Sequence, residues 1–206
     1  MESLRQIYTQ CRKEICNRLR EFRCPLVGGG EEGLFAEMAF CLFTPQSNAR
    51  SCWEAVQRLC SKDLIWKGTP ALVSSHLKGV RFHHTKAQRL VQARGLFPLF
   101  LGELKGNPEP QYLREWLVKN IPGLGYKEAS HFLRNIGLGD DLAILDRHIL
   151  RNLQAFGIIP RIPRSLTRKK YLEIEGKMKA WAEEISIPLS HLDLVLWFRE
   201  KKEIFK

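Results

Sequence analysis

The chain has 206 residues, of which 44% are hydrophobic and 27% are charged. This size and composition fit one ordinary globular domain, or two small lobes that share a core. They exclude a disulfide-stapled mini-protein, a disordered tail and a collagen-like repeat. The 33 Lys and Arg residues outnumber the 22 Asp and Glu residues, which gives a formal net charge of +11. This excess favours a polyanionic partner, with nucleic acid first and an anionic membrane surface second.

The N-terminal sequence and the cysteines bear on the cellular compartment. Met1-Glu-Ser-Leu-Arg lacks the apolar run of a secretory signal, and no stretch approaches the roughly 18 apolar residues of a spanning helix. We therefore expect a soluble intracellular protein that does not span a membrane. The six cysteines all lie at or before Cys60, and no pair has C-x-x-C spacing. We expect reduced, mostly buried thiols and no zinc or iron–sulfur site.

Apolar residues recur at three-to-four spacing through most of the chain, which predicts an all-α protein. A first amphipathic helix is expected to end before Cys24-Pro25, and a helix buried on most sides is expected over 34–43. Ser47 is expected to cap a further helix that runs to about Cys60. Shorter helices are expected near 70–77, 84–94 and 96–104, with glycines between them.

The segment Gly106-Asn-Pro-Glu-Pro110 is the best candidate for a boundary between lobes, because two prolines in three positions prevent a helix from continuing. This divides the chain into a mainly helical lobe over 1–107 and a second lobe over 108–206. In the second lobe, two apolar helix faces flank Ile121-Pro-Gly-Leu-Gly125. The pattern is a helix, a five-residue hairpin and a second helix that begins at about Tyr126.

A Pro-Gly-x-Gly hairpin between two helices suits the binding of a phosphate. Gly123 and Gly125 allow backbone angles closed to other residues and bring main-chain N–H groups to the surface, where the start of the second helix adds partial positive charge. A plain helix–helix turn uses the same residues, and the hairpin alone does not separate the two interpretations.

The second helix carries Lys127, His131 and Arg134 opposite its apolar side, so we expect these three side chains on an exposed face. A lysine on such a face is usually only solvated. Lys127, however, lies in the first turn, where the helix dipole disfavours the ammonium form and tends to lower the pKa. An amine placed there is partly prepared to act as a nucleophile.

Asp146 follows the apolar run Leu142-Ala-Ile-Leu145 and begins a helix that we expect to end at about Phe156, before Gly157. This is a natural N-cap position. A capping role and a catalytic role are compatible, because a carboxylate held by backbone N–H groups stays ionised and fixed in place.

Residues 121–135 and 142–150 together resemble the helix-hairpin-helix DNA glycosylases, and within them the compact archaeal and bacterial 8-oxoguanine DNA glycosylase/AP lyase branch. Residues 37–46, residues 193–197 and the terminal Lys206 also resemble that branch. The resemblance implies two helical lobes with a DNA-binding cleft. It also implies a cytoplasmic, nucleoid-associated monomer without metal or cofactor, whose partner is double-stranded DNA containing 8-oxoguanine.

The resemblance also implies roles for individual residues. Lys127 would attack the sugar and form a Schiff base that undergoes β-elimination, and Asp146 would stabilise the positive charge that develops on the sugar. Gln46 would fill the place of the extruded nucleotide. Asp193 and Trp197, four residues apart on one helix face, would recognise the base together with the α-carboxylate of Lys206, although Trp197 also suits a core position. Phe82 is a further stacking candidate. The expected DNA contacts are Gln46, Gly123, Gly125, His131, Arg134, Arg147 and His148.

Two other functions fit the same sequence. One is a helix-hairpin-helix module that binds DNA without cutting it, which needs no amine at position 127. The other is a glycosylase for another oxidised base. Trapping of a covalent adduct with borohydride distinguishes the first from an enzyme, and a panel of single-lesion duplexes distinguishes the second.

Overall fold

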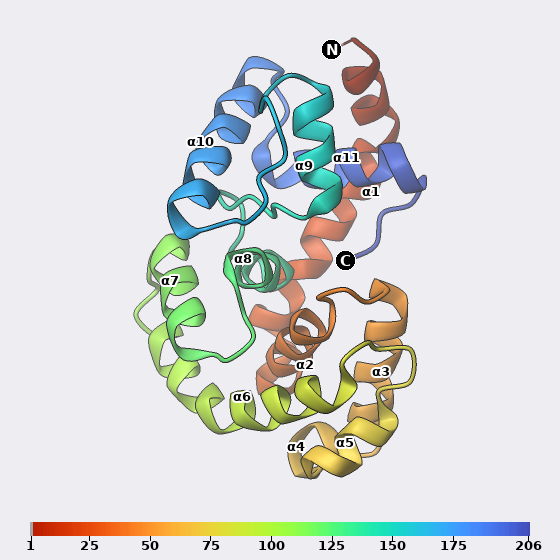
Figure 1. Cartoon of the computed structure of the whole chain (residues 1–206), viewed down its shortest axis with the longest axis vertical. Helices are drawn as coiled ribbons and strands as arrows, with labels where there is room; N and C mark the ends of the chain where they lie inside the picture. Colours follow the sequence, from red (N-terminus) through yellow and green to blue (C-terminus); the bar gives the residue numbers. More distant parts are fainter. Residues whose placement is uncertain (1) are drawn as a thin grey trace. The chain divides into compact units, whose positions relative to one another are not determined.

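The computed structural model describes residues 2–206, which fold into α-helices without a strand among them (Figure 1). The all-α prediction is therefore confirmed. No helix in this range combines the length and the apolar character needed to cross a membrane. The helices, in chain order, are α1 Glu2–Val27, α2 Gly30–Phe43, α3 Ala49–Ser61, α4 Leu64–Lys67, α5 Pro70–His76, α6 His83–Leu104, α7 Pro110–Asn120, α8 Tyr126–Asn135, α9 Arg147–Ala155, α10 Arg168–Glu184 and α11 Leu189–Lys201.

The chain forms two compact units. Unit 1 contains the residues up to Cys24 together with Leu133–Lys206, and unit 2 contains Pro25–Phe132. This differs from the predicted boundary between residues 107 and 108. The reason is that α7 packs on α6, where the ring of Phe100 lies 6.0 Å from that of Trp116 and 5.3 Å from that of Phe132. These contacts keep residues 110–132 with unit 2.

Unit 2 is built around α2, which is buried from Leu34 to Phe43, as the sequence predicts. Helices α3 and α6 both pack on α2, and α5 packs on α6. The ring of Phe35 lies 4.6 Å from that of Trp66 and 4.9 Å from that of Phe97. This aromatic cluster fixes α4 and α6 against the buried helix.

Unit 1 packs α9 and α10 against α11. The extended segment 142–145 is fixed by polar groups of α10. The Tyr171 hydroxyl donates to Ala143 O at 2.6 Å and accepts from Leu145 N at 3.3 Å, and a carboxylate oxygen of Glu175 accepts from Ala143 N at 2.8 Å. The backbone that leads into Asp146 is therefore held at Ala143 and at Leu145.

Three predicted helix boundaries are wrong. Helix α1 runs to Val27 and includes Pro25; only two residues of the helix follow this proline, so its missing N–H disturbs only the end of α1. Asn48, not Ser47, caps α3 by accepting from Ser51 N at 3.2 Å. The two helices expected over 84–94 and 96–104 are one helix, α6, with Gly95 and Pro98 inside it. Its continuous buried stripe outweighs the local cost of these two residues.

Candidate active site and nucleic-acid interface

The hairpin between α7 and α8 is anchored by two buried apolar side chains, Ile121 and Leu124. Leu124 N donates to Ile121 O at 3.2 Å, which closes the turn. Gly123 has φ +98°, a left-handed conformation that favours glycine, and a Cβ there would lie 2.5 Å from Arg89 Cδ. Gly125 is exposed. Gly123 thus has a backbone angle of the kind that the phosphate-cradle hypothesis invokes, whereas Gly125 does not have a positive φ.

Lys127 lies in the first turn of α8, directly after this hairpin. Its side chain is 21% exposed, and Nζ lies 3.7 Å from Glu128 Oε1. The amine is therefore partly desolvated but still reaches the surface, next to backbone N–H groups at the start of a helix, which have no partner within it. This position is better suited to an amine that acts as a nucleophile than to a charge that is only solvated.

The predicted exposed face of α8 is wrong for His131 and Arg134, which are only 7% and 5% exposed. The His131 ring meets the Phe40 ring edge-on at 5.6 Å. The Arg134 guanidinium lies 4.6 Å from the Phe22 ring centroid and 3.5 Å from Asp193 Oδ2. Both side chains are buried against these partners, so neither lies on an exposed face of α8 where it could contact DNA at the surface.

Asp146 is the N-cap of α9, as predicted. Its Oδ1 accepts from Ile149 N at 2.8 Å, and the side chain is half-buried. Together with the fixed segment before it, this bond holds the carboxylate in one orientation. Because this oxygen is bonded to the start of the helix, the carboxylate cannot rotate freely. A catalytic carboxylate needs such a fixed position.

Asp193 lies on α11 with its side chain only 13% exposed. Burial raises the pKa of the Asp193 carboxyl, the Arg134 guanidinium opposes this rise, and the nearby Asp146 carboxylate adds to it. Among the described residues, Asp193 Oδ1 and the indole Nε1 of Trp197 are buried polar atoms without a hydrogen-bond partner. Such atoms are costly, and two of them on one helix face favour a site that a ligand completes.

Trp197 also connects this face to α9. Its ring meets the His148 ring edge-on at 5.1 Å, and His148 Nδ1 is hydrogen-bonded to Glu200 Oε2 at 2.6 Å. Glu200 Oε1 accepts a second bond from Asn152 Nδ2 at 2.8 Å. Unit 1 therefore brings Asp146, Asp193 and Trp197 together. The Arg134–Asp193 and His148–Glu200 pairs could not be predicted from local sequence patterns, because their partners lie far apart in the sequence.

The remaining predicted residues lie near the surface of their units. Arg147 is exposed at the start of α9, and Lys206 is half-buried. In unit 2, Gln46 is exposed and Phe82 is 56% exposed, and both have left-handed backbones with φ +56° and +58°. Non-glycine residues rarely adopt this conformation, and they do so preferentially at functional sites.

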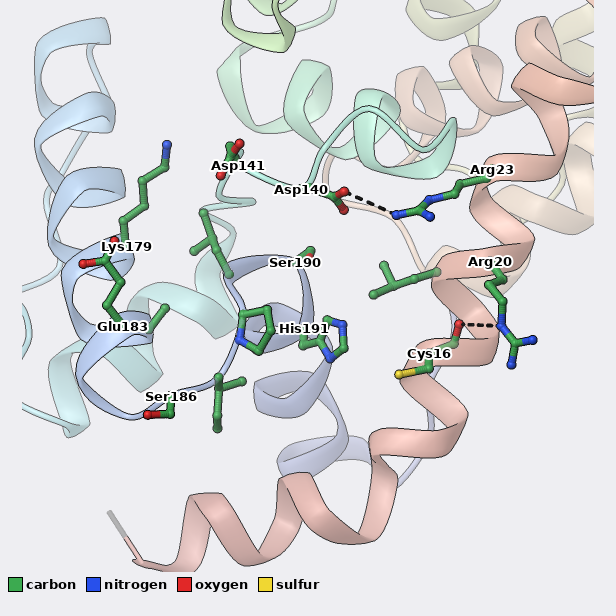
Figure 2. Close-up of a pocket in the computed structure, with 15 residues that line it drawn as sticks. Cys16, Arg20, Arg23, Asp140, Asp141, Lys179, Glu183, Ser186, Ser190 and His191 are labelled. Carbon is green, nitrogen blue, oxygen red and sulfur yellow. Dashed lines mark hydrogen bonds and ion pairs between the residues drawn. The ribbon is translucent and has the colours of Figure 1, made fainter.

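Unit 1 also has an open groove of about 700 Å³ that none of the predicted site residues lines (Figure 2). Its charged lining is balanced between cations and anions, and Arg23 pairs with Asp140 at 3.4 Å. The groove therefore lacks the net positive charge of a phosphate site. Its charged residues are Arg20, Arg23, Lys179, Asp140, Asp141 and Glu183.

Comparison with known proteins identifies the family. Residues 15–187 match the family model described as 8-oxoguanine DNA glycosylase. The chain belongs to the 8-oxoguanine DNA glycosylase family. An 8-oxoguanine DNA glycosylase/AP lyase from Fusobacterium nucleatum is 42% identical, over 98% of this chain and 96% of that protein. The Methanocaldococcus jannaschii relative of the same name is 37% identical, over 93% of this chain and 91% of that protein.

Solved structures of the family have the same fold. The Thermotoga maritima 8-oxoguanine DNA glycosylase matches with a TM-score of 0.90 and 33% identity, covering all of this chain and 97% of that one. The M. jannaschii 8-oxoguanine glycosylase/lyase in complex with a 15mer DNA containing 8-oxoguanine matches with a TM-score of 0.89 and 34% identity, covering 100% of both chains. The resemblance noted in the sequence is therefore confirmed at the level of family and fold.

Proposed function

We propose that this chain is a bifunctional 8-oxoguanine DNA glycosylase/AP lyase that acts on nucleoid DNA in the cytoplasm. The observation that carries the proposal is Lys127, a partly buried amine in the first turn of α8 beside the Gly123 hairpin. The relatives named 8-oxoguanine DNA glycosylase/AP lyase, and the neighbouring structure in complex with lesion-containing DNA, support the activity and the substrate.

In the proposed mechanism, the lesion nucleotide leaves the base stack and presents C1′ of its sugar to Lys127. The neutral amine attacks C1′ while the bond to the base breaks and its electron pair leaves with the base. Loss of a proton and opening of the sugar ring give a Schiff base, and removal of a C2′ proton then expels the 3′ phosphate. Asp146, with its fixed carboxylate, stabilises the positive charge on the sugar and accepts the proton of the amine.

Recognition of the base is assigned to unit 1. 8-Oxoguanine carries a proton on N7 where guanine carries a lone pair, so a well-placed acceptor discriminates between the two bases. Asp193 Oδ1 is a buried oxygen without a partner among the described residues, and Arg134 favours its ionised form. The α-carboxylate of Lys206 is the second proposed acceptor. Trp197 supplies an aromatic face, and its unpaired indole N–H adds a donor.

The loops of unit 2 are assigned to the DNA duplex. Gln46 fills the place of the extruded nucleotide, and Phe82 stacks against an exposed base. Both side chains are exposed at positive-φ positions, which supports a projecting role. The hairpin glycines bind a phosphate, while Arg147 provides a further backbone contact at the start of α9.

A borohydride-trapping assay on a duplex with a single 8-oxoguanine tests the proposed function. We expect a covalent protein–DNA adduct and strand cleavage at the lesion. A non-catalytic helix-hairpin-helix module would bind the duplex but give no adduct. A parallel panel of duplexes with other oxidised bases identifies the lesion, and an adduct with one of those bases but none with 8-oxoguanine would assign a different substrate.

Extension of the chain beyond Lys206 tests the role of the terminal carboxylate. We expect a short C-terminal extension to lower 8-oxoguanine excision by roughly 5- to 150-fold, because a lost hydrogen bond to a buried polar group costs about 1–3 kcal/mol. The measurement is single-turnover excision, compared with cleavage of an abasic site by the same variant. An equal fall in both rates would assign the terminus to the fold, and no change in either would leave base recognition to Asp193.

Substitution of a hairpin glycine tests the phosphate cradle. Gly125→Ala places a methyl group 3.1 Å from Glu128 Oε2, the mobile end of a side chain, so the fold is expected to tolerate it. We expect binding to plain and lesion duplexes to weaken alike by about 10-fold, because phosphate contacts do not read the base. Gly102→Ala, on α6 with no atom within 4 Å of the added group, is the matched control. A loss confined to lesion DNA would contradict the cradle.

A further inference from the structure

Lys86 is a buried lysine that the proposed chemistry does not use. It is 2% exposed and lies on α6, four residues after Phe82, whose carbonyl accepts from Lys86 N at 3.0 Å. Side chains on an α-helix lean toward its N-terminus. The Lys86 side chain therefore extends back past the start of α6, toward the loop that contains Gln46.

The ammonium group of Lys86 makes a full set of hydrogen bonds there. Nζ donates to Phe43 O at 2.6 Å, to Pro45 O at 2.7 Å and to Ser47 Oγ at 2.9 Å. An ammonium has three donors, and here all three are used. The acceptors lie on both sides of Gln46, so the loop is bound to α6 immediately before and immediately after its exposed tip.

Ser47 extends this connection to a second loop. Its Oγ also accepts from Arg81 N at 3.0 Å. Arg81 directly precedes Phe82, and its guanidinium lies 5.5 Å from the Phe82 ring centroid. One buried ammonium and one hydroxyl thus join the Gln46 loop to the Phe82 loop, although the two are far apart in the sequence.

Both loop tips need such support. Gln46 and Phe82 have left-handed backbones, which residues with side chains keep only where the surrounding structure holds them. Phe82 is also a largely exposed aromatic residue. Without the connection through Lys86 and Ser47, each tip would be free to relax to an ordinary backbone conformation, and their relative position would be lost.

A buried lysine is a poor device for stability alone. Burial lowers the pKa of Lys86 to about 8, and the positive charges of Arg89 and Arg81 add to this effect, while Cys52 and Glu128 oppose it. Replacing buried charged groups by apolar residues of similar size is often neutral for stability. Lys86 makes three directed hydrogen bonds to one loop. An apolar residue could not make these bonds and so could not fix the loop in the same way.

We propose that Lys86 is a positioning residue for base extrusion, which holds the Gln46 and Phe82 loops together so that both tips enter the duplex as one rigid wedge. This inference rests on the proposed glycosylase function. It assigns Lys86 no contact with DNA and no part in the covalent steps. Its effect is confined to substrates whose base must be taken out of a stack.

Lys86→Met tests the proposal, because methionine keeps the length of the side chain and removes the donors. We expect single-turnover excision of 8-oxoguanine from duplex DNA to fall by about 10- to 100-fold. The fluorescence of a 2-aminopurine placed beside the lesion rises when the stack opens. We expect the rate of this rise to fall by a similar factor. Cleavage of an abasic site in single-stranded DNA, where no stack has to open, is expected to stay within about twofold of wild type.

Lys105→Met, an exposed lysine at the other end of α6, is the matched control and is expected to retain both activities. Unchanged duplex excision by a folded Lys86→Met protein would overturn the proposal. So would an equal fall on single-stranded abasic DNA, since that would indicate general loss of structure. If the wild-type protein itself neither excises 8-oxoguanine nor forms a borohydride adduct, the proposed function fails, an outcome seen before any variant is compared.

Ser47→Ala decides the matter if Lys86→Met does not fold. It removes the hydroxyl that joins the two loops but leaves Lys86 its two carbonyl acceptors, so no buried charge loses all its partners. We expect duplex excision to fall by roughly 3- to 10-fold, again with single-stranded abasic cleavage unchanged. Full duplex excision by this variant would overturn the proposal.

Discussion

Lys127→Gln is expected to abolish base excision and Schiff-base trapping together, a loss on the order of 10⁴-fold or more. Glutamine has no nucleophilic amine, so neither the attack on C1′ nor the covalent intermediate can form. Binding to lesion DNA is expected to stay within about tenfold, or 1.4 kcal/mol, because the hairpin beside it is unchanged. Single-turnover excision, borohydride trapping and a binding titration on one 8-oxoguanine duplex provide the three measurements.

The matched control is Lys105→Gln, the same substitution at an exposed lysine directly after α6. It removes the same charge from the protein, so any general effect of net charge on DNA binding appears in both variants. Normal excision by Lys127→Gln would refute the mechanism. Loss of trapping with excision retained would assign Lys127 to the lyase step alone and base removal to an activated water.

The parts of the site that could be predicted from the sequence depend on local signals. The hairpin, the start of α8 at Tyr126, and the cap at Asp146 all follow from residue types within a few positions of each other. Gly157, with φ +74°, prevents α9 from continuing, as expected. Glycine conformation and side-chain capping are properties of short segments, so one sequence suffices to find them.

The orientation of α8 could not be predicted in the same way. A helical wheel divides a helix into one apolar and one polar face, and it places Arg134 on the polar face. In the structure this arginine is buried because Asp193 and Phe22, from two distant segments, supply a negative charge and an aromatic face. Such compensation is non-local, and the sequence of α8 does not contain it.

The same limit applies to Lys86 and to α6. A lysine within a helix indicates a solvated side chain, and only the return of the 43–47 loop to the start of α6 gives its ammonium three buried acceptors. Gly95 and Pro98 predict a break that tertiary packing overrides. The division into units is also non-local, since residues up to Cys24 belong with the C-terminal part of the chain.

Asp146→Asn is expected to lower single-turnover excision by about 10²- to 10³-fold while leaving the fold almost unchanged. Asparagine is as good an N-cap as aspartate, so the bond to Ile149 N can be kept. The negative charge is lost, and with it the stabilisation of the positive charge on the sugar and the acceptor for the amine proton. Thermal unfolding and excision, measured on the same preparation, separate the two roles of this residue.

Asp146→Ala completes the comparison, because alanine removes both the charge and the cap. Its free energy of unfolding is expected to fall by about 1 kcal/mol relative to wild type, the usual cost of a lost N-cap. Its excision rate should match that of Asp146→Asn, since both variants lack the carboxylate. If Asp146→Asn is instead fully active and only Asp146→Ala is impaired, in proportion to its loss of stability, Asp146 acts solely as the cap of α9. The stabilising charge must then come from another carboxylate, for which Asp193 is a candidate because its carboxyl interacts electrostatically with that of Asp146.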